Sequence, residues 1–160
     1  YMVINTPMYL DTNKVVYGAY YLFSSSTHAA DAEAAKAELA RLTEAVNEIL
    51  NLACKAFTEN DLEAARDVEP LEEIIDKIKE QLRTNHIKRL QQGECSIEGG
   101  FVWSDLLTNL ERTSDHCSNI AACVIDAADM DLHRSIREMK SDSPYYKQKY
   151  QVYAAKYLNK

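Results

Sequence analysis

Residues 103–127 read WSDLLTNLERTSDHCSNIAACVIDA. Mostly apolar side chains recur through this stretch at alternating steps of three and four residues: Trp103, Leu106, Leu110, Thr113, Cys117, Ile120, Val124 and Ala127. This spacing gathers them on one face of an α-helix. The stretch therefore predicts a long amphipathic helix that buries this face against other helices.

Two similar helices are predicted earlier in the chain, the first within residues 31–57 and the second running to about Leu90. Their larger apolar residues repeat with the same spacing: Leu39, Leu42, Val46, Ile49 and Ala53, then Val68, Leu71, Ile75, Ile78 and Leu82. Asn60 and Glu63 form a pair typical of a helix N-terminus, which would open the second helix. Glycines within residues 91–100 favour a turn before the third helix: Gly93, Gly99 and Gly100.

These patterns predict an all-α fold, an elongated antiparallel three-helix bundle with short N-terminal and C-terminal helical extensions. Helices of roughly 27 to 30 residues would be about 40 Å long, and short connections make neighbours antiparallel. The bundle is assigned to residues 28–140. Residues 1–27 are an N-terminal extension, in which polar residues 11–13 can cap a short helix ending near Phe23.

Residues 141–160 are predicted to form a basic, tyrosine-rich helix that begins at Pro144. One stripe along it carries four tyrosines: Tyr146, Tyr150, Tyr153 and Tyr157. Residues 132–160 hold seven basic and two acidic side chains, whereas residues 1–131 hold 11 basic and 23 acidic ones. We expect this tail to dock on the acidic bundle or to stay solvated; a partner-binding or lipid-facing tail is the alternative.

Composition narrows the class of protein. The 160 residues carry a net charge of -7, which disfavours binding to a nucleic-acid backbone. The longest apolar run, Val15 to Phe23, is too short to span a membrane. The four cysteines form no CxxC pair, which favours a reducing cytosol. Cys54, Cys117 and Cys123 are expected to be small buried hydrophobes, whereas Cys95 lies in the 91–100 loop with only His86 near in sequence.

Two carboxylate pairs lie off the predicted apolar faces, Glu72 with Asp76 and Glu111 with Asp115. Like charges four residues apart cost a helix about 0.2 to 0.5 kcal/mol, so helix stability does not explain them. Either a metal ion compensates them, since carboxylates suit hard cations, or the pairs sit on a solvated face. The sequence contains no Glu-x-x-His pair, P-loop or His-Glu-x-x-His motif, so we expect no enzyme.

The string LLTNLERTSDHCSNIA, residues 106–121, resembles the signature helix of PhoU-type proteins, which reads approximately N-L-E-R-I-G-D-H-x-x-N-I. Residues 64–78, AARDVEPLEEIIDKI, resemble the preceding PhoU helix with its E-x-x-x-D motif. Residues 86–107, HIKRLQQGECSIEGGFVWSDLL, are similar to the PhoU-like region of bacterial sodium/phosphate cotransporters. The resemblance covers about residues 35–128.

This resemblance implies a helical regulator of phosphate uptake that holds iron or zinc on its E-x-x-x-D motifs. By matching position the metal ligands would be Glu72, Asp76, Glu111 and Asp115. Arg112 would be an ion-pair partner or clamp, and Asn109 and Asn119 would flank the site as polar neighbours. Pro70, just before the first motif, is expected to remove a backbone donor and to kink the second helix.

The resemblance also implies a cytoplasmic location at the inner face of the cell membrane, with a transporter membrane domain or another phosphate-uptake component as partner. PhoU-type proteins usually carry two three-helix halves and this sequence shows one, so a homodimer is expected unless the chain is part of a longer protein. Starting at Tyr1 rather than Met hints at the latter. The competing interpretation is a structural dimerisation bundle without metal, assembled through the tyrosine-striped tail.

Overall fold

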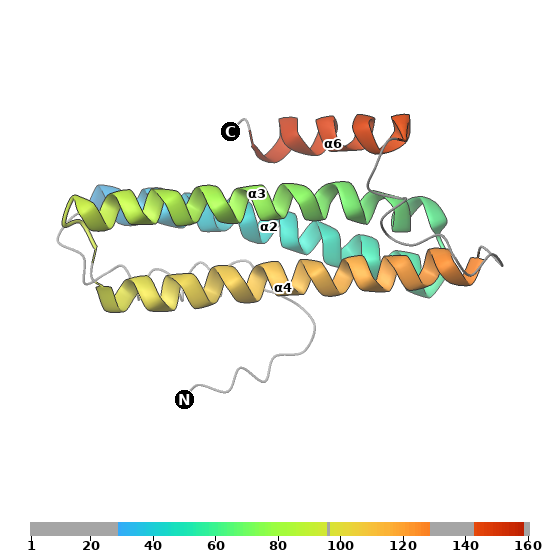
Figure 1. The fold of residues 1–160 in the computed structure, drawn as a ribbon, viewed down its shortest axis with the longest axis horizontal. Coiled ribbons are helices and arrows are strands. Elements are labelled where there is room, and N and C mark those ends of the chain that lie inside the picture. The colour runs from blue at the N-terminus through green and yellow to red at the C-terminus, as the bar shows by residue number, and fades with distance from the viewer. Residues whose placement is uncertain (1–28, 96, 129–142, 159–160) are drawn as a thin grey trace.

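The computed structural model describes residues 29–95, 97–128 and 143–158. Its helices are α2 (Ala29–Glu59), α3 (Leu62–Gln91), α4 (Ile97–Ala128) and α6 (Pro144–Tyr157). Helices α2, α3 and α4 form an elongated antiparallel bundle, and α6 lies along α3 on the side away from α4 (Figure 1). The predicted all-α bundle is confirmed, and the helix predicted before Phe23 lies outside the described residues.

The bundle's core is the one predicted for the first two helices. Each larger apolar residue named for them above is at most 2% exposed. Trp103 of α4 completes this core. Burying an aliphatic side chain of this size stabilises a fold by about 1.5 to 3 kcal/mol, so the three-four spacing is the main determinant of the bundle.

The buried face of α4 differs from its prediction. It consists of Trp103, Leu107, Leu110, Ser114, Cys117, Ala121, Ala122, Val124 and Ile125. Leu106 and Thr113 are only half-buried, and Ile120 is 41% exposed. At 100° per residue the centre of the buried face is turned by about 60° from the predicted one. The small side chains of Ser114 and Ala121 are buried where the prediction had placed Thr113 and Ile120.

The ends of α3 are also set differently from the sequence prediction. Asp61, not Asn60, caps the helix, and its carboxylate accepts hydrogen bonds from the backbone of Glu63 and Ala64. Asn60 instead adopts a left-handed conformation (φ 53°) after α2, which asparagine tolerates better than most residues. At the other end, Gly93 (φ 74°) closes a Schellman motif.

Two further expectations about small residues were wrong. Gly99 and Gly100 belong to the first turns of α4 rather than to a loop. Cys54 and Cys123 are exposed, and only Cys117 is a buried hydrophobe. Burial raises the pKa of the Cys117 thiol to about 11.

None of the described helices is long and apolar enough to cross a membrane.

Helix α6 docks on the bundle, which is one of the two outcomes that the charge segregation left open. Ser143 caps it by accepting a hydrogen bond from the Tyr146 backbone, and Pro144 opens it. Its tyrosine stripe faces inward, with Tyr157 fully buried and Tyr153 6% exposed. Two lysines form ion pairs with the bundle, Lys149 with Asp67 and Lys156 with Glu48. The stripe therefore packs against the chain's own α2 and α3.

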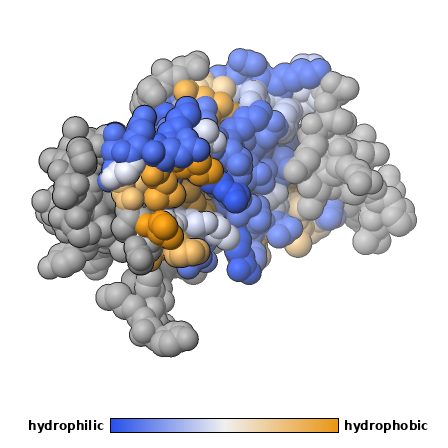
Figure 2. Space-filling model, turned by 60° about the vertical axis from the view of Figure 1, so that its left-hand side comes forward, coloured by the Kyte–Doolittle hydropathy of each residue, from blue (hydrophilic) through white to orange (hydrophobic). Residues whose placement is uncertain are grey.

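The end of the bundle where α3 meets α4 carries exposed apolar side chains. They are Ile87 on α3 and Ile97, Phe101 and Val102 on α4. Figure 2 brings this end forward and shows apolar surface between hydrophilic residues.

Candidate functional site

Two side-chain contacts fix how the predicted motifs of α3 and α4 face one another. Near one end, the Ser118 hydroxyl donates a hydrogen bond to the Glu69 carboxylate. About ten residues further along α3, Lys79 Nζ lies 2.8 Å from Glu111 Oε1. Because the two helices are antiparallel, the intervening residues of the motifs lie between these contacts. The structure therefore places the two E-x-x-x-D motifs in register along the α3/α4 seam.

The motif carboxylates are less solvated than the sequence predicted. Glu72 is only 8% exposed, and Asp76 and Asp115 are half-buried. The side chain of Glu111 is 20% exposed where it pairs with Lys79. For α4 the reason is that its buried face is rotated from the predicted one. This rotation places Glu111 and Ser118 closer to α3 than the sequence predicted. We call this surface, formed by Glu72, Asp76, Glu111 and Asp115, the carboxylate face.

Glu69 is the acidic residue buried most deeply beside this face. It is 3% exposed and accepts the Ser118 hydroxyl. Pro70 follows it, and α3 continues through this proline as one helix to Gln91. Glu72 and Asp76 therefore belong to the same continuous helix as Glu69. Ser114, opposite on α4, satisfies its buried hydroxyl by donating to the Glu111 carbonyl at 2.7 Å.

The polar neighbours implied by the resemblance are arranged differently from expectation. Arg112 is exposed and forms no ion pair with a described residue. Lys79 of α3 instead neutralises Glu111, and no local sequence pattern indicates this pair, because it joins two helices. Asn109 and Asn119 are exposed on α4 at either end of the second motif.

Oxygen donors of this kind suit iron, manganese or zinc, so the type of ligand fits a metal ion. In the described part of the chain, the number of these donors that come together at one point is smaller than a complete metal site requires. Within the described ranges, no three His, Cys, Asp or Glu side chains gather so that they could hold a metal ion. The carboxylate face by itself thus offers pairs of ligands rather than a closed coordination sphere.

Helix α6 covers the neighbouring acidic edge of α3. Asp67 is 8% exposed and accepts hydrogen bonds from Tyr145, at 2.6 Å, and from Lys149, at 2.7 Å. The Tyr146 hydroxyl donates to Glu73. Burial raises the pKa of the Tyr146 phenol, and the hydrogen bond to Glu73 raises it further. These phenols therefore stay protonated and act as donors to carboxylates at neutral pH.

A second polar cluster lies at the far end of the bundle. His86 of α3 is 5% exposed, its Nδ1 lies 3.8 Å from Cys95 Sγ, and its ring lies 6.1 Å from that of Trp103. A Cβ on Gly100 would stand 2.8 Å from His86 Nε2, so glycine at this position is what admits the imidazole. The proximity of His86 and Cys95 in sequence is thus matched in space.

We expect this histidine to make the fold acid-sensitive. Burial lowers the pKa of the His86 imidazole below its usual 6.5, the charge of Arg89 lowers it further, and Glu38 opposes both. The unfolded chain then takes up a proton more readily than the folded chain. Stability contributed by the neutral imidazole is present above pH 6.5 and is lost as the pH falls through the lower, folded pKa, at up to about 1.4 kcal/mol per pH unit.

Urea denaturation at pH 7.5 and pH 5.5 measures this effect. The change in unfolding free energy between the two pH values should shrink in His86→Leu, which removes the titrating group. It should persist in His116→Leu, which alters an exposed histidine of α4. Equal pH dependence in wild type and His86→Leu would contradict the assignment.

Comparison with known proteins places the motif helices in a family. Residues 39–124, more than half of the chain, match the PhoU domain. The chain belongs to the PhoU family. The matched region of the PhoU domain contains both carboxylate motifs and most of α2, α3 and α4, whereas α6 lies beyond it.

Two curated relatives share this PhoU region. The phosphate-specific transport system accessory protein PhoU homolog 1 of Thermotoga maritima is 32% identical over 73 residues, which are 46% of this chain and 32% of that protein. An uncharacterized protein of Deinococcus radiodurans is 34% identical over 85 residues, which are 52% of this chain and 31% of that protein. The chain matches about a third of the length of each relative. No solved structure matches it.

Proposed function

We propose that this chain is a non-enzymatic regulatory module of phosphate uptake that acts by contact with the transport machinery at the cytoplasmic face of the membrane. The observation that carries the proposal is the PhoU match over residues 39–124, supported by a relative named as an accessory protein of phosphate-specific transport. The register of the two motifs along the α3/α4 seam supports the proposal, because it aligns their carboxylates along one surface that a partner could contact.

The partner in this proposal is a transporter membrane domain or another phosphate-uptake component, with a sodium/phosphate cotransporter-related protein as the first candidate. Its support is the resemblance of residues 86–107 to that group. A homodimer would supply the second three-helix half that PhoU-type proteins usually carry. The competing idea of assembly through the tyrosine stripe is weakened, because Tyr153 and Tyr157 are buried within the chain itself.

Deleting the gene in its source organism tests the regulatory role. Uptake of radiolabelled phosphate by wild-type cells should fall when external phosphate is plentiful. We expect this fall to be lost in the deletion strain and restored by the wild-type gene. Uptake that still falls normally without the gene would contradict the proposal.

The proposal includes metal binding on the carboxylate face. Pairs of carboxylates on α3 and α4 supply the donors, and water or another chain would complete the coordination. When bound, the ion would supply positive charge that neutralises Glu72, Asp76, Glu111 and Asp115. Competition with Lys79 for Glu111 would then make metal binding sensitive to this ion pair.

Metal content tests this part of the proposal directly. The purified chain is incubated with iron, zinc or manganese and then desalted. The amount of metal bound per chain is measured by inductively coupled plasma mass spectrometry. We expect Glu111→Ala with Asp115→Ala to remove most of the bound metal. The matched control, Asp105→Ala with Asp126→Ala, alters two exposed carboxylates of the same helix and should retain it. If the motif variant keeps its metal, these residues are not the ligands.

A further inference from the structure

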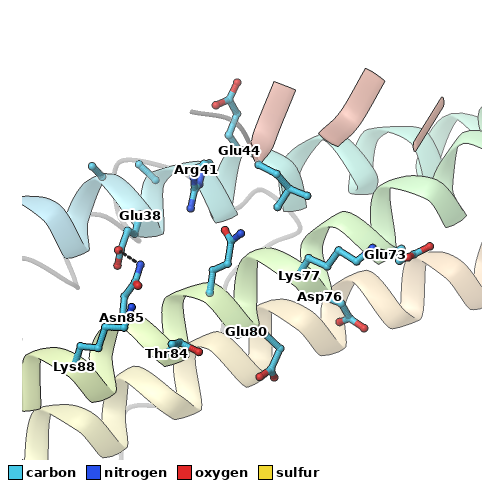
Figure 3. A pocket seen from close by; sticks show the side chains of 14 residues that line it. Glu38, Arg41, Glu44, Glu73, Asp76, Lys77, Glu80, Thr84, Asn85 and Lys88 are labelled. Carbon is cyan, nitrogen blue, oxygen red and sulfur yellow. Dashed lines mark hydrogen bonds and ion pairs between the residues drawn. The ribbon is translucent and has the colours of Figure 1, made fainter. Parts of the chain in front are cut away.

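A groove between α2 and α3 begins where α6 ends. Its volume is about 1500 Å³, and Leu158, the residue after α6, lies at its edge. The α2 wall includes Ala37, Ala40 and Glu44, and the α3 wall includes Gln81 and Thr84. Figure 3 shows the labelled side chains of both walls on either side of the gap, with Arg41 reaching from α2 toward α3.

This groove continues the seat of α6. In the seat, α6 contacts Asp67, Glu73 and Lys77 of α3 and reaches Glu48 of α2. Glu73 and Lys77 also line the open groove, so one surface passes from the occupied part to the open part. The open part extends toward the start of α2 and the end of α3.

The charges of the seat show what kind of helix this surface accepts. Residues 29–128 hold 20 acidic and 10 basic side chains, whereas α6 holds three lysines and no acid. In the contacts of α6 with Asp67, Glu73 and Glu48, the donor is a tyrosine hydroxyl or a lysine. The seat is thus a row of carboxylates that accepts a cationic, tyrosine-bearing helix.

The open groove offers the same acceptors. Its lining includes five carboxylates and three cations. Glu44 and Glu80 are exposed, and neither forms an ion pair with a residue in the described part of the chain. Small side chains at Ala37 and Ala40 would let a helix approach α2 closely. Shape and charge therefore match a second helix of the α6 type lying beyond Leu158.

We infer that the open groove binds a cationic, amphipathic helix of another protein, with lysine and tyrosine side chains directed at the carboxylates of α2 and α3. This helix would be the part of the partner that contacts the chain in the proposed regulatory function. Only the assignment of the helix to a transport component rests on that proposed function. Binding is measured on the purified chain, so its outcome is independent of any change in phosphate uptake.

The probe is a fluorescent peptide with the sequence of residues 143–158, SPYYKQKYQVYAAKYL, titrated into the full chain. The covalently attached α6 is present at an effective concentration on the order of millimolar, so micromolar peptide does not displace it from its seat. Anisotropy should report saturable binding that weakens about tenfold between 50 and 300 mM salt. The same peptide with its three lysines replaced by glutamine should not bind.

Variants of the chain locate the binding. Glu44→Lys with Glu80→Lys should weaken the peptide about tenfold, while Asp105→Lys with Asp126→Lys, which makes the same charge change on α4, should not. Asp67→Asn, in the seat of α6, should leave peptide affinity unchanged. Equal weakening by both double variants would mean nonspecific attraction, and loss of binding in Asp67→Asn would mean exchange with α6. Either result overturns the inference.

Sedimentation of the chain alone separates a partner helix from a second copy. The inference predicts that Glu44→Lys with Glu80→Lys leaves the oligomeric state unchanged. Dissociation of an oligomer by this variant would mean that the groove is filled by another copy of the chain, and would also overturn the inference.

Discussion

Replacing Trp103 with alanine should lower the free energy of unfolding by about 3 to 5 kcal/mol. The indole is 1% exposed, belongs to the core formed by α2, α3 and α4, and lies against the ring of His86. Removing the indole leaves a cavity, because the long helices packed around it cannot move closer together to fill the space. Because this is the only tryptophan, unfolding is followed by circular dichroism in urea.

Phe101 provides the matched control for this experiment. It is an aromatic residue two positions earlier on α4, but it is 70% exposed. Phe101→Ala should change the unfolding free energy by less than about 0.5 kcal/mol. Similar losses in the two variants would mean that the face of α4 turned toward the core is wrongly assigned.

Tyr157→Ala should release α6 from the bundle. Tyr157 is fully buried, its hydroxyl donates to Glu48, and Lys156 binds the same carboxylate. Loss of a buried aromatic side chain costs about 3 kcal/mol or more, and a loss of this size would reduce the protection of α6 amides against hydrogen exchange by about a hundredfold. Amides of α2, α3 and α4 should stay protected, since these three helices supply most of the side chains of the core, to which α6 adds only Tyr153 and Tyr157.

Val152→Ala is the control within the same helix. Val152 is 55% exposed on α6, so its replacement should leave the exchange rates of α6 almost unchanged. If Tyr157→Ala also leaves them unchanged, α6 is not held by its tyrosine stripe. Unprotected α2 and α3 in that variant would show instead that α6 is part of one cooperative core.

The sequence predicted helices well because their apolar residues repeat regularly. The faces of α2 and α3 agree with expectation, since large aliphatic residues occupy every buried position named for them. For α4 the pattern was ambiguous. Ile120 and Ala121 are neighbours, and hydrophobicity alone favours burying the isoleucine. The structure buries the alanine, because packing against the neighbouring helices decides which face of a helix turns inward, and a single-helix pattern does not contain that information.

The same limit applies to the candidate site. The two carboxylate pairs could be recognised from their spacing, but their burial depends on the rotation of α4. The Lys79–Glu111 ion pair and the Ser118–Glu69 hydrogen bond each join two residues that are about 30 to 50 positions apart in sequence. Local sequence patterns do not reveal such contacts. The opposite charges of tail and bundle indicated that α6 either docks or stays solvated, and they did not indicate its partners Asp67 and Glu73.

Complementation of the deletion strain tests whether the carboxylate face of α3 and α4 carries the regulation of phosphate uptake. Cells receive the wild-type gene, a variant with Glu72→Gln, Asp76→Asn, Glu111→Gln and Asp115→Asn, or a control with Glu63→Gln, Asp105→Asn and Asp126→Asn at exposed positions. Circular dichroism confirms that each purified chain is folded. We expect wild type and control to restore the fall in uptake at high phosphate, whereas the carboxylate-face variant should not restore it. Full restoration by the folded carboxylate-face variant would contradict the claim.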